Sequence, residues 1–325
     1  MPAIRQPGKI NGDTTLVDIG LRGIYGMMSV YLIQGDRKCL IDAGSRSEAP
    51  RLVKILSEMG VFPPDLIIVT HPHWDHAQGI PFLREKASRL GKKIEILASH
   101  EAIPFLEDAS FNDIFGGGPY ESIQGVTTVR EGDTVDLGGI SLQIYEIPGH
   151  CRGHIAILDK KNNNIFVGDG IGYQFSDTIT IPNFMPPTWD PDAFLSSINK
   201  LSQIPYETLC MAHFGCIYGS EAKSILAEAV ETYKVWWQWF ERNEERLSNT
   251  NYMLQDMRKE NKIGNPIIRP ISLRLMVLLG LMTAAGTVAG KKTAIIDKLF
   301  FSGFIDWLAT GYKIYKSTAE REPGH

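Results

Sequence analysis

Three histidines and an aspartate lie within six residues, in the segment His71-Pro72-His73-Trp74-Asp75-His76. Neutral imidazole is the commonest side-chain ligand of transition metals, and a carboxylate adds charge compensation. The segment follows the apolar run 66–69, so we expect a loop that leaves a buried strand. Because strand alternation would send positions 71 and 76 to opposite faces, only a compact turn can aim these groups at one point. Four such groups favour two metal subsites over one.

A histidine-rich surface loop without a metal is the alternative interpretation. The whole chain has only eight histidines among 325 residues. Three of them in one hexapeptide are therefore poorly explained by composition alone, and we favour the metal-binding interpretation.

Three further candidate ligands stand at the ends of predicted strands, with glycine nearby: His150, Asp169 and His213. Taken singly, an aspartate after a strand is usually a cap or turn residue, and a lone histidine is usually a hydrogen-bonded loop residue. Together with the hexapeptide they make five histidines and two aspartates. We expect one face of a sheet sandwich to collect them, because glycine permits close approach of the backbone there.

In these residues the chain resembles the metallo-β-lactamase fold superfamily, and most of all its glyoxalase-II-like and lactonase-like hydrolases. The resemblance covers roughly residues 15–218. It depends on the pattern His-x-His-x-Asp-His, followed in order by a histidine, an aspartate and a final histidine. It implies an α/β fold, namely a four-layer αββα sandwich, here with a C-terminal helical extension.

The resemblance also implies a role for each of the seven residues. All would be metal ligands: His71, His73 and His150 of a first ion, Asp75, His76 and His213 of a second, and Asp169 as the bridge between them. Asp42 would orient a ligand from behind. The cofactor would be two divalent metal ions. Zinc is the first expectation, and the nitrogen and oxygen donors also suit iron or manganese.

A dinuclear site of this kind implies a hydrolase whose metal-bridging hydroxide attacks an ester, thioester or lactone carbonyl. Asp75 and Asp169 would act in catalysis mainly through the metals. Tyr173, four residues after Asp169, is a candidate hydrogen-bond donor to the developing oxyanion. The bridging aspartate argues against antibiotic-hydrolysing β-lactamases, which lack it. Two alternatives stay open: a phosphodiesterase, and a metal-binding regulatory protein with little turnover.

The elements that must position these groups alternate between strand and helix. We expect strands at 28–34, 37–42, 66–70 and 94–98, and helices at 48–59 and 80–90. A second β-rich block spans about 127–167, and a helix follows Asp190-Pro191. Residues 100–124 contain three consecutive glycines and are either a surface insertion or a mobile flap over the site.

The pattern becomes helical after residue 220. The expected helix 220–247 carries Trp236, Trp237, Trp239 and Phe240. These aromatic side chains either form a wall of the substrate pocket or pack in a core or a homodimer contact. We therefore expect a catalytic domain at 1–218, a helical segment at 219–316 and a disordered tail at 317–325.

The composition of the whole chain argues against nucleic acid as a partner. The formal net charge of −4 gives no electrostatic footprint for nucleic acid, so we expect a small-molecule substrate. Four cysteines without a CxxC pair, and no apolar stretch behind Met1, predict a reducing, cytoplasmic setting. The uncharged run 275–290 is shorter than the ~20 residues that a bilayer needs. It predicts a buried or interface helix rather than a membrane span.

Overall fold

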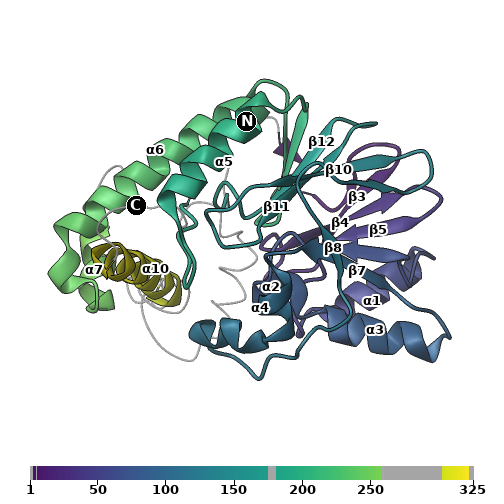
Figure 1. The fold of residues 1–325 in the computed structure, drawn as a ribbon, viewed down its shortest axis with the longest axis horizontal. Coiled ribbons are helices and arrows are strands. Elements are labelled where there is room, and N and C mark those ends of the chain that lie inside the picture. Colours follow the sequence, from purple (N-terminus) through teal and green to yellow (C-terminus); the bar gives the residue numbers. More distant parts are fainter. Residues whose placement is uncertain (1–2, 5, 175–180, 258, 260–301, 322–325) are drawn as a thin grey trace, which may run out of the picture.

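Two seven-stranded sheets form the centre of the fold in the computed structural model, which describes residues 3–4, 6–174, 181–257, 259 and 302–321 (Figure 1). The first sheet has the order β2-β3-β4-β5-β6-β7-β8. Its strands are Gly8–Lys9 (β2), Thr14–Asp18 (β3), Ser29–Gln34 (β4), Lys38–Ile41 (β5), Leu66–Ile68 (β6), Glu95–Ser99 (β7) and Thr127–Val129 (β8). Strands β2 to β5 pair antiparallel, and β5 to β8 pair parallel.

The second sheet has the order β1-β14-β13-β12-β11-β10-β9. Its strands are Ala3–Ile4 (β1), Thr134–Asp136 (β9), Ser141–Glu146 (β10), Ile155–Asp159 (β11), Asn164–Gly168 (β12), Thr208–Met211 (β13) and Gly215–Tyr218 (β14). Only β12 and β13 pair parallel among these strands. Because β1 pairs with β14, the N-terminal residues belong to the sheet of the second half.

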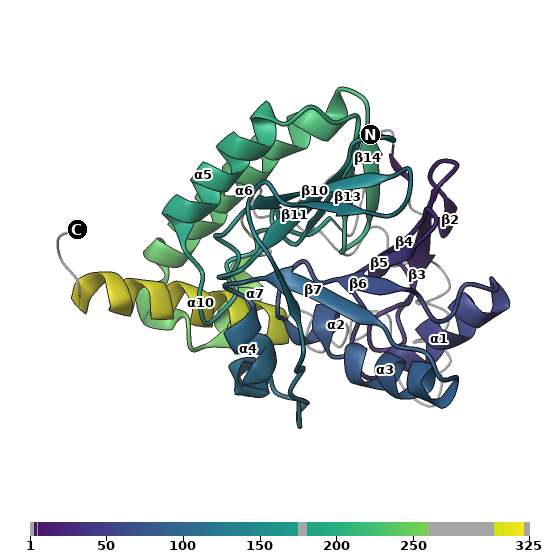
Figure 2. The ribbon, with the colours of Figure 1, turned by 45° about the vertical axis from the view of Figure 1, so that its right-hand side comes forward.

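Helices cover the outer face of each sheet (Figure 2). Helices α1 (Ala49–Glu58) and α3 (Ile80–Arg89) lie on the first sheet, and α5 (Pro191–Gln203) and α6 (Glu221–Arg242) lie on the second. Between the sheets, apolar side chains of both form one core, with Ile41 and Ile68 from the first and Ile144 and Phe166 from the second. This is the four-layer αββα sandwich that the sequence predicted.

Local signals in the sequence explain where these helices begin and end. In α1, Leu52 and Leu56 are four residues apart and both are buried. Gly60 follows with a φ of +70°, a left-handed conformation that glycine adopts without strain and that ends helices. At the start of α5, the Asp190 carboxylate accepts hydrogen bonds from the backbone N–H groups of Asp192 and Ala193, both at 3.0 Å.

The C-terminal helices are α6, α7 (Thr250–Met257) and α10 (Ser302–Arg321). They share one apolar core with the second sheet and α5. The ring centroids of Trp237 in α6 and Tyr312 in α10 lie 4.7 Å apart, which joins the two helices. The division of the chain into a catalytic domain at 1–218 and a helical segment at 219–316 stays a prediction.

Two expectations about the C-terminal part need correction. The helix predicted over 220–247 ends at Arg242, and a short 3₁₀ turn at Glu244–Arg246 follows. Residues 317–321, predicted as part of a disordered tail, continue helix α10. The Lys316 ammonium pairs with Glu241 of α6 at 3.3 Å and helps to hold this end of α10 in place.

The uncharged run 275–290 and residues 322–325 lie outside the described residues. Within the ranges that the structure describes, no helix is both long enough and apolar enough to cross a membrane.

Candidate metal centre

The histidine-rich segment leaves the end of β6 and turns at once into the one-turn helix α2 (Trp74–Ala77). His73 is the last extended residue, with φ −63° and ψ 150°. Its carbonyl accepts hydrogen bonds from the backbone N–H groups of His76 and Ala77, both at 3.0 Å. Because the backbone changes from extended to helical at this point, side chains on either side of His73 can face one centre. This helix start is the compact turn that the sequence required.

Three loops at one edge of the sandwich bring the other predicted ligands to this turn. His150 lies in the loop after β10, Asp169 directly follows β12, and His213 lies between β13 and β14. All three side chains belong to buried residues, at most 3% exposed. Their positions at strand ends explain why residues far apart in the sequence meet here.

Asp169 lies at the centre of the cluster. Its Oδ2 is 3.8 Å from the Nε2 of His71, 3.4 Å from that of His76 and 3.6 Å from that of His150. Its Oδ1 is 3.7 Å from the Nε2 of His213. One carboxylate therefore faces histidines of both predicted subsites, as a bridging ligand would.

The seven predicted side chains form three overlapping groups whose ligand atoms lie within 4.8 Å of one another. The groups are His71, His73 and His150; His71, His76 and Asp169; and Asp75, His76 and His213. Within the first group, His73 Nδ1 lies 2.9 Å from His150 Nε2. Within the third, Asp75 Oδ2 lies 3.4 Å from His213 Nε2. The first and third groups have the composition of the two subsites that the resemblance implied.

The donor set fits a divalent metal. The Nε2 atoms of His71 and His76 and the Oδ1 of Asp169 are buried without a hydrogen-bond partner among the described residues. Buried polar atoms of this kind are rare and costly, and each needs an explanation. A cation among imidazole nitrogens and carboxylate oxygens supplies one, because these are the donors that zinc, iron and manganese accept.

The electrostatics of the cluster favour the protonation states that metal ligands need. Burial, followed by the neighbouring imidazole of His76, lowers the pKa of His71 well below its ordinary value. Burial raises the pKa of Asp169, but the nearby His213 and His76 outweigh this effect and hold that pKa below its ordinary value. At these two residues the electrostatics therefore favour a neutral imidazole and an ionised carboxylate, the forms in which both side chains bind metals.

Three carboxylates act on His76, namely Asp169, Asp42 and Asp75. Burial lowers its pKa, but the surrounding carboxylates, led by Asp169, raise the pKa well above the ordinary value for histidine. The same negative charges that favour a proton on His76 would favour a cation bound to its Nε2.

Asp42 orients His76 from behind the cluster, as the resemblance implied. Its Oδ2 accepts a hydrogen bond from His76 Nδ1 at 2.8 Å, and its Oδ1 accepts one from the Thr70 backbone N–H at 2.8 Å. Asp42 has a φ of +64°, which is uncommon for a residue with a Cβ. This backbone places the carboxylate so that it fixes the Nδ1–H tautomer of His76 and aims Nε2 at the centre.

Two main-chain carbonyls orient other histidines of the cluster. His150 Nδ1 donates to the carbonyl of Asn183 at 2.7 Å, and His213 Nδ1 donates to that of Met27 at 2.5 Å. Neither of these two partners was predicted from the sequence. Every residue carries a carbonyl, so residue type gave no signal that could have found them.

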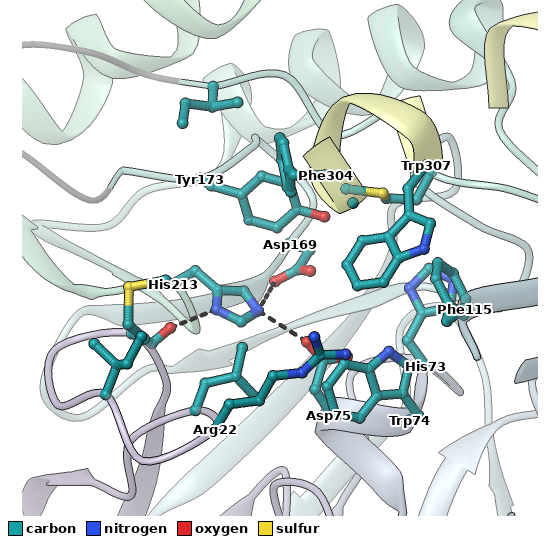
Figure 3. Close-up of a pocket in the computed structure, with 16 residues that line it drawn as sticks. Arg22, His73, Trp74, Asp75, Phe115, Asp169, Tyr173, His213, Phe304 and Trp307 are labelled. Atoms are coloured by element: carbon teal, nitrogen blue, oxygen red, sulfur yellow. Dashed lines mark hydrogen bonds and ion pairs between the residues drawn. The ribbon is translucent and has the colours of Figure 1, made fainter. Parts of the chain in front are cut away.

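Tyr173 lies beside the centre, and in Figure 3 its hydroxyl points towards Asp169. Its ring centroid is 5.2 Å from that of His213. Burial, and then the negative charge of Asp169, raise the pKa of Tyr173 well above its ordinary value. The phenol therefore stays neutral and can donate a hydrogen bond. Its role as an oxyanion donor stays a prediction.

A family model described as the metallo-beta-lactamase superfamily matches residues 24–213, more than half of the 325 residues. The chain belongs to the metallo-beta-lactamase superfamily. All seven residues of the cluster lie within the matched range.

The curated relatives of this superfamily member include hydroxyacylglutathione hydrolases. The protein of Ruegeria pomeroyi is 29% identical over 184 residues, which are 53% of this chain and 58% of that protein. The protein of a Methylobacterium species is 32% identical over 123 residues, which are 38% of this chain and 39% of that protein. The matches thus span less than two thirds of the length of these relatives.

Solved structures of the superfamily share its fold. ST1585, an archaeal superfamily protein from Sulfolobus tokodaii, has a TM-score of 0.54 and 21% identity, over 68% of this chain and 86% of that one. TTHA1429, a family protein from Thermus thermophilus, has a TM-score of 0.56 and 18% identity, over 96% of this chain and 95% of that one. TTHA1623 in a di-iron-bound form has a TM-score of 0.51 and 24% identity, over 66% of this chain and 98% of that one.

A cavity of about 220 Å³ opens beside the cluster of this metallo-beta-lactamase fold (Figure 3). Four cluster residues line it: His73, Asp75, Asp169 and His213. The rest of the lining is mainly apolar or aromatic: Leu21, Ile24, Met27, Trp74, Phe115, Tyr173, Ile181, Met185, Gly303, Phe304 and Trp307, together with Arg22. A small ligand in this cavity would touch the cluster and an apolar wall at once.

The aromatic wall comes from α10 rather than from α6. Phe304 and Trp307 of α10 line the cavity, and Figure 3 shows both beside Tyr173 and Phe115. Of the alternatives for the aromatic side chains of α6, the pocket wall is wrong, since none of the four lines the described cavity: Trp236, Trp237, Trp239 and Phe240. They pack in the core beneath α10 instead, and so support the helix that forms the wall.

The insertion 100–124 packs directly against the histidine-rich turn. It contains helix α4 (Ile103–Glu107) and a 3₁₀ turn at Ala109–Phe115. The Phe111 ring stacks on His73 with centroids 5.5 Å apart, and Phe115 meets the same imidazole edge-on at 5.0 Å. The insertion is therefore part of the site. Whether it moves as a flap stays a prediction.

Proposed function

We propose that the protein is a dinuclear metal-dependent hydrolase that cleaves an ester or thioester carbonyl bond, a lactone included. The observation that carries this proposal is the convergence of five histidines and two aspartates on one buried centre beside an apolar cavity. The curated relatives are named for the hydrolysis of an acyl derivative of glutathione, which supports a thioester first.

We infer the ligands from the geometry. The first ion would be held by His71, His73 and His150, and the second by Asp75, His76 and His213. Asp169 would bind both ions. Two divalent ions, when bound, supply Lewis acidity towards the carbonyl and a lowered pKa of water. Zinc, iron and manganese all suit these donors, and the di-iron-bound structural neighbour is a reason to test iron.

The side chains around the cluster orient the groups that take part in the reaction, and they exclude water from the cavity. Asp42 holds His76 in one tautomer, and the Tyr173 hydroxyl stands next to Asp169 as a hydrogen-bond donor for the developing oxyanion. Phe304 and Trp307 form an apolar surface on which an acyl group can pack. Phosphodiester cleavage is the weaker candidate, because only one basic side chain, Arg22, lines the described cavity.

Metal content and a substrate panel test this function. Protein purified without chelator should contain about two metal ions per chain and should hydrolyse S-acyl glutathiones faster than bis-p-nitrophenyl phosphate. His73→Ala should lose metal and activity, whereas His100→Ala, a change at an exposed histidine outside the cluster, should lose neither. A folded protein with no metal, or one that binds metal and turns over no member of the panel, would refute the hydrolase.

A further inference from the structure

Arg22 is the one basic side chain in the described lining of the cavity. The structure records no ion pair for its guanidinium among the described residues. The rest of the lining is the metal-binding cluster and apolar or aromatic groups. Figure 3 shows the Arg22 side chain reaching along the cavity beside Asp75 and Trp74. Arg22 is an exposed residue, so its guanidinium is open to solvent and to a ligand that enters the cavity beside the cluster.

The backbone of Arg22 is held in an unusual turn. Arg22 and Gly23 form the tip between Leu21 and Ile24, whose backbone groups exchange two hydrogen bonds of 2.9 Å. Arg22 has a φ of +50°, in the left-handed region that glycine or asparagine enters more easily. The backbone conformation of the turn therefore does not explain why this residue is an arginine. A role of the guanidinium side chain explains it better.

Two buried carboxylates brace this turn. The Glu48 side chain is 6% exposed, and its Oε1 accepts a hydrogen bond from the backbone N–H of Arg22 at 3.0 Å. The Asp18 carboxylate accepts hydrogen bonds from the backbone N–H groups of Gly20 and Gly26, at 2.9 and 3.0 Å, and so closes both ends of the loop. The arginine is consequently presented from a fixed backbone, which lowers the entropy lost when a ligand binds.

Two tryptophans flank the guanidinium. The Cζ of Arg22 lies 5.5 Å from the ring of Trp74 and 5.9 Å from the ring of Trp307. Trp74 stands between two predicted ligands, His73 and Asp75, and Trp307 belongs to α10. Aromatic faces attract and align a guanidinium while its N–H edge stays open to a further partner. The edge therefore meets the cavity between the cluster and the apolar wall.

We propose that Arg22 is an anion-binding subsite and that the substrate is an amphiphilic thioester or ester carrying a carboxylate. The carboxylate pairs with Arg22, the apolar acyl group packs on Phe304 and Trp307, and the hydrolysed carbonyl lies at the cluster. A carboxylate fits better than a phosphate, because the single guanidinium shares its cavity with two aspartates, Asp75 and Asp169, whose negative charge disfavours a doubly charged anion. This inference rests on the proposed hydrolase function.

Binding of two inert probes tests the subsite without turnover. The probes are (hexylthio)acetate and the uncharged 2-(hexylthio)acetamide, titrated calorimetrically into full-length protein. Wild-type protein should bind the carboxylate more tightly than the amide, by on the order of 5-fold for a partly exposed guanidinium–carboxylate pair. Arg22→Gln should abolish this preference, and Arg22→Lys should keep part of it because the charge remains.

Arg46→Gln is the matched control. It removes the same charge from an exposed arginine that pairs with Glu121 at 2.8 Å and does not line the cavity, so the preference should persist. A preference that survives Arg22→Gln would show that the cluster binds the carboxylate. That result would overturn the subsite, as would equal affinity for both probes or no binding of either.

Hydrolysis of S-hexanoyl thioglycolate and of its amide separates this inference from the proposed function. Arg22→Gln should raise KM for the carboxylate substrate on the order of 5-fold, with kcat and the amide reaction unchanged. Binding through Arg22 without hydrolysis of either thioester would refute the function and keep the subsite. Hydrolysis of both with an unchanged KM in Arg22→Gln would refute the subsite and keep the function.

Discussion

Asp169 faces histidines of both predicted subsites: its Oδ2 lies near His150 and His76, and its Oδ1 lies near His213. Asp169 belongs to the group that also contains one histidine of each predicted subsite, His71 and His76. At the scale of single residues, loss of this carboxylate should therefore disturb both ions, whereas loss of a neighbouring donor should disturb only the reaction.

We predict that Asp169→Ala lowers both metal content and activity, and that Tyr173→Phe lowers activity alone. The tyrosine change removes one hydrogen bond, worth on the order of 10²–10³ in kcat when it serves an oxyanion. Elemental analysis and initial rates on one thioester distinguish the two effects. Equal losses of rate in both variants at full metal content would mean that Asp169 is not the bridge.

Asp42 lies outside the three groups of candidate ligands and positions His76, which belongs to two of them. We predict that Asp42→Asn weakens metal binding 10- to 100-fold, the usual effect of removing an orienting partner. Titration of chelator-treated protein with Zn²⁺ measures this. Asp159→Asn is the control, because Asp159 is equally buried and accepts hydrogen bonds from a turn at Lys161 and Asn162 instead. Equal metal affinity in the Asp42 and Asp159 variants would refute an orienting role.

At the scale of elements, helix α10 decides the shape of the cavity, because it carries Phe304 and Trp307. It packs tightly against the chain beneath it at Gly311. A Cβ built there would lie 2.2 Å from the carbonyl oxygen of Phe184. A backbone carbonyl cannot move aside as the end of a flexible side chain can. A larger residue at position 311 would therefore force the helix to shift.

We predict that Gly311→Ala destabilises the fold by about 1–3 kcal/mol, the typical cost of overpacking. It should also change the acyl-chain preference, because the aromatic wall moves with the helix. Urea unfolding followed by circular dichroism, and KM over a series of acyl lengths, measure the two effects. Gly303→Ala in the same helix meets nothing within 4 Å and should not destabilise. Stability in Gly311→Ala equal to that of Gly303→Ala would contradict this packing.

At the scale of the whole molecule, the metal centre joins loops from both sheets. His71 to His76 follow a strand of the first sheet, and His150, Asp169 and His213 lie in loops of the second. A bound ion therefore links the two halves of the sandwich in the folded state, and the unfolded chain has no such site. The expected homodimer through the C-terminal helices stays a prediction.

We predict that metal stabilises the folded protein by mass action. At a free metal concentration about 1,000 times Kd, the gain is ~4 kcal/mol, provided that the unfolded chain binds none. Thermal unfolding of chelator-treated protein should therefore show a lower Tm, which added Zn²⁺ restores. Asp169→Ala should respond weakly. The same Tm with and without metal in the wild-type protein would contradict binding across the two sheets.

The sequence alone determined the seven side chains that converge and, through its resemblance to the metallo-β-lactamase superfamily, the αββα architecture. The side chains follow from local chemistry, because a rare concentration of histidine marks the turn at 71–76 and the other candidate ligands stand near glycine at strand ends. Capping residues such as Asp190, and Gly60 after α1, placed helix ends within a few residues. The pairing of β1 with β14 was not predicted, because two-residue strands carry no periodic pattern.

Only the tertiary structure decided what surrounds the centre. The carbonyls of Asn183 and Met27 orient two histidines, but a carbonyl has no side-chain signature. The wall is formed by α10 instead of the tryptophan-rich α6, because aromatic density indicates burial without indicating which helix faces the cavity. The position of Arg22 between Trp74 and Trp307 could not be predicted, because the two rings come from distant parts of the chain. Metal ligands can be recognised by residue type and spacing, whereas the walls of a pocket depend on long-range packing.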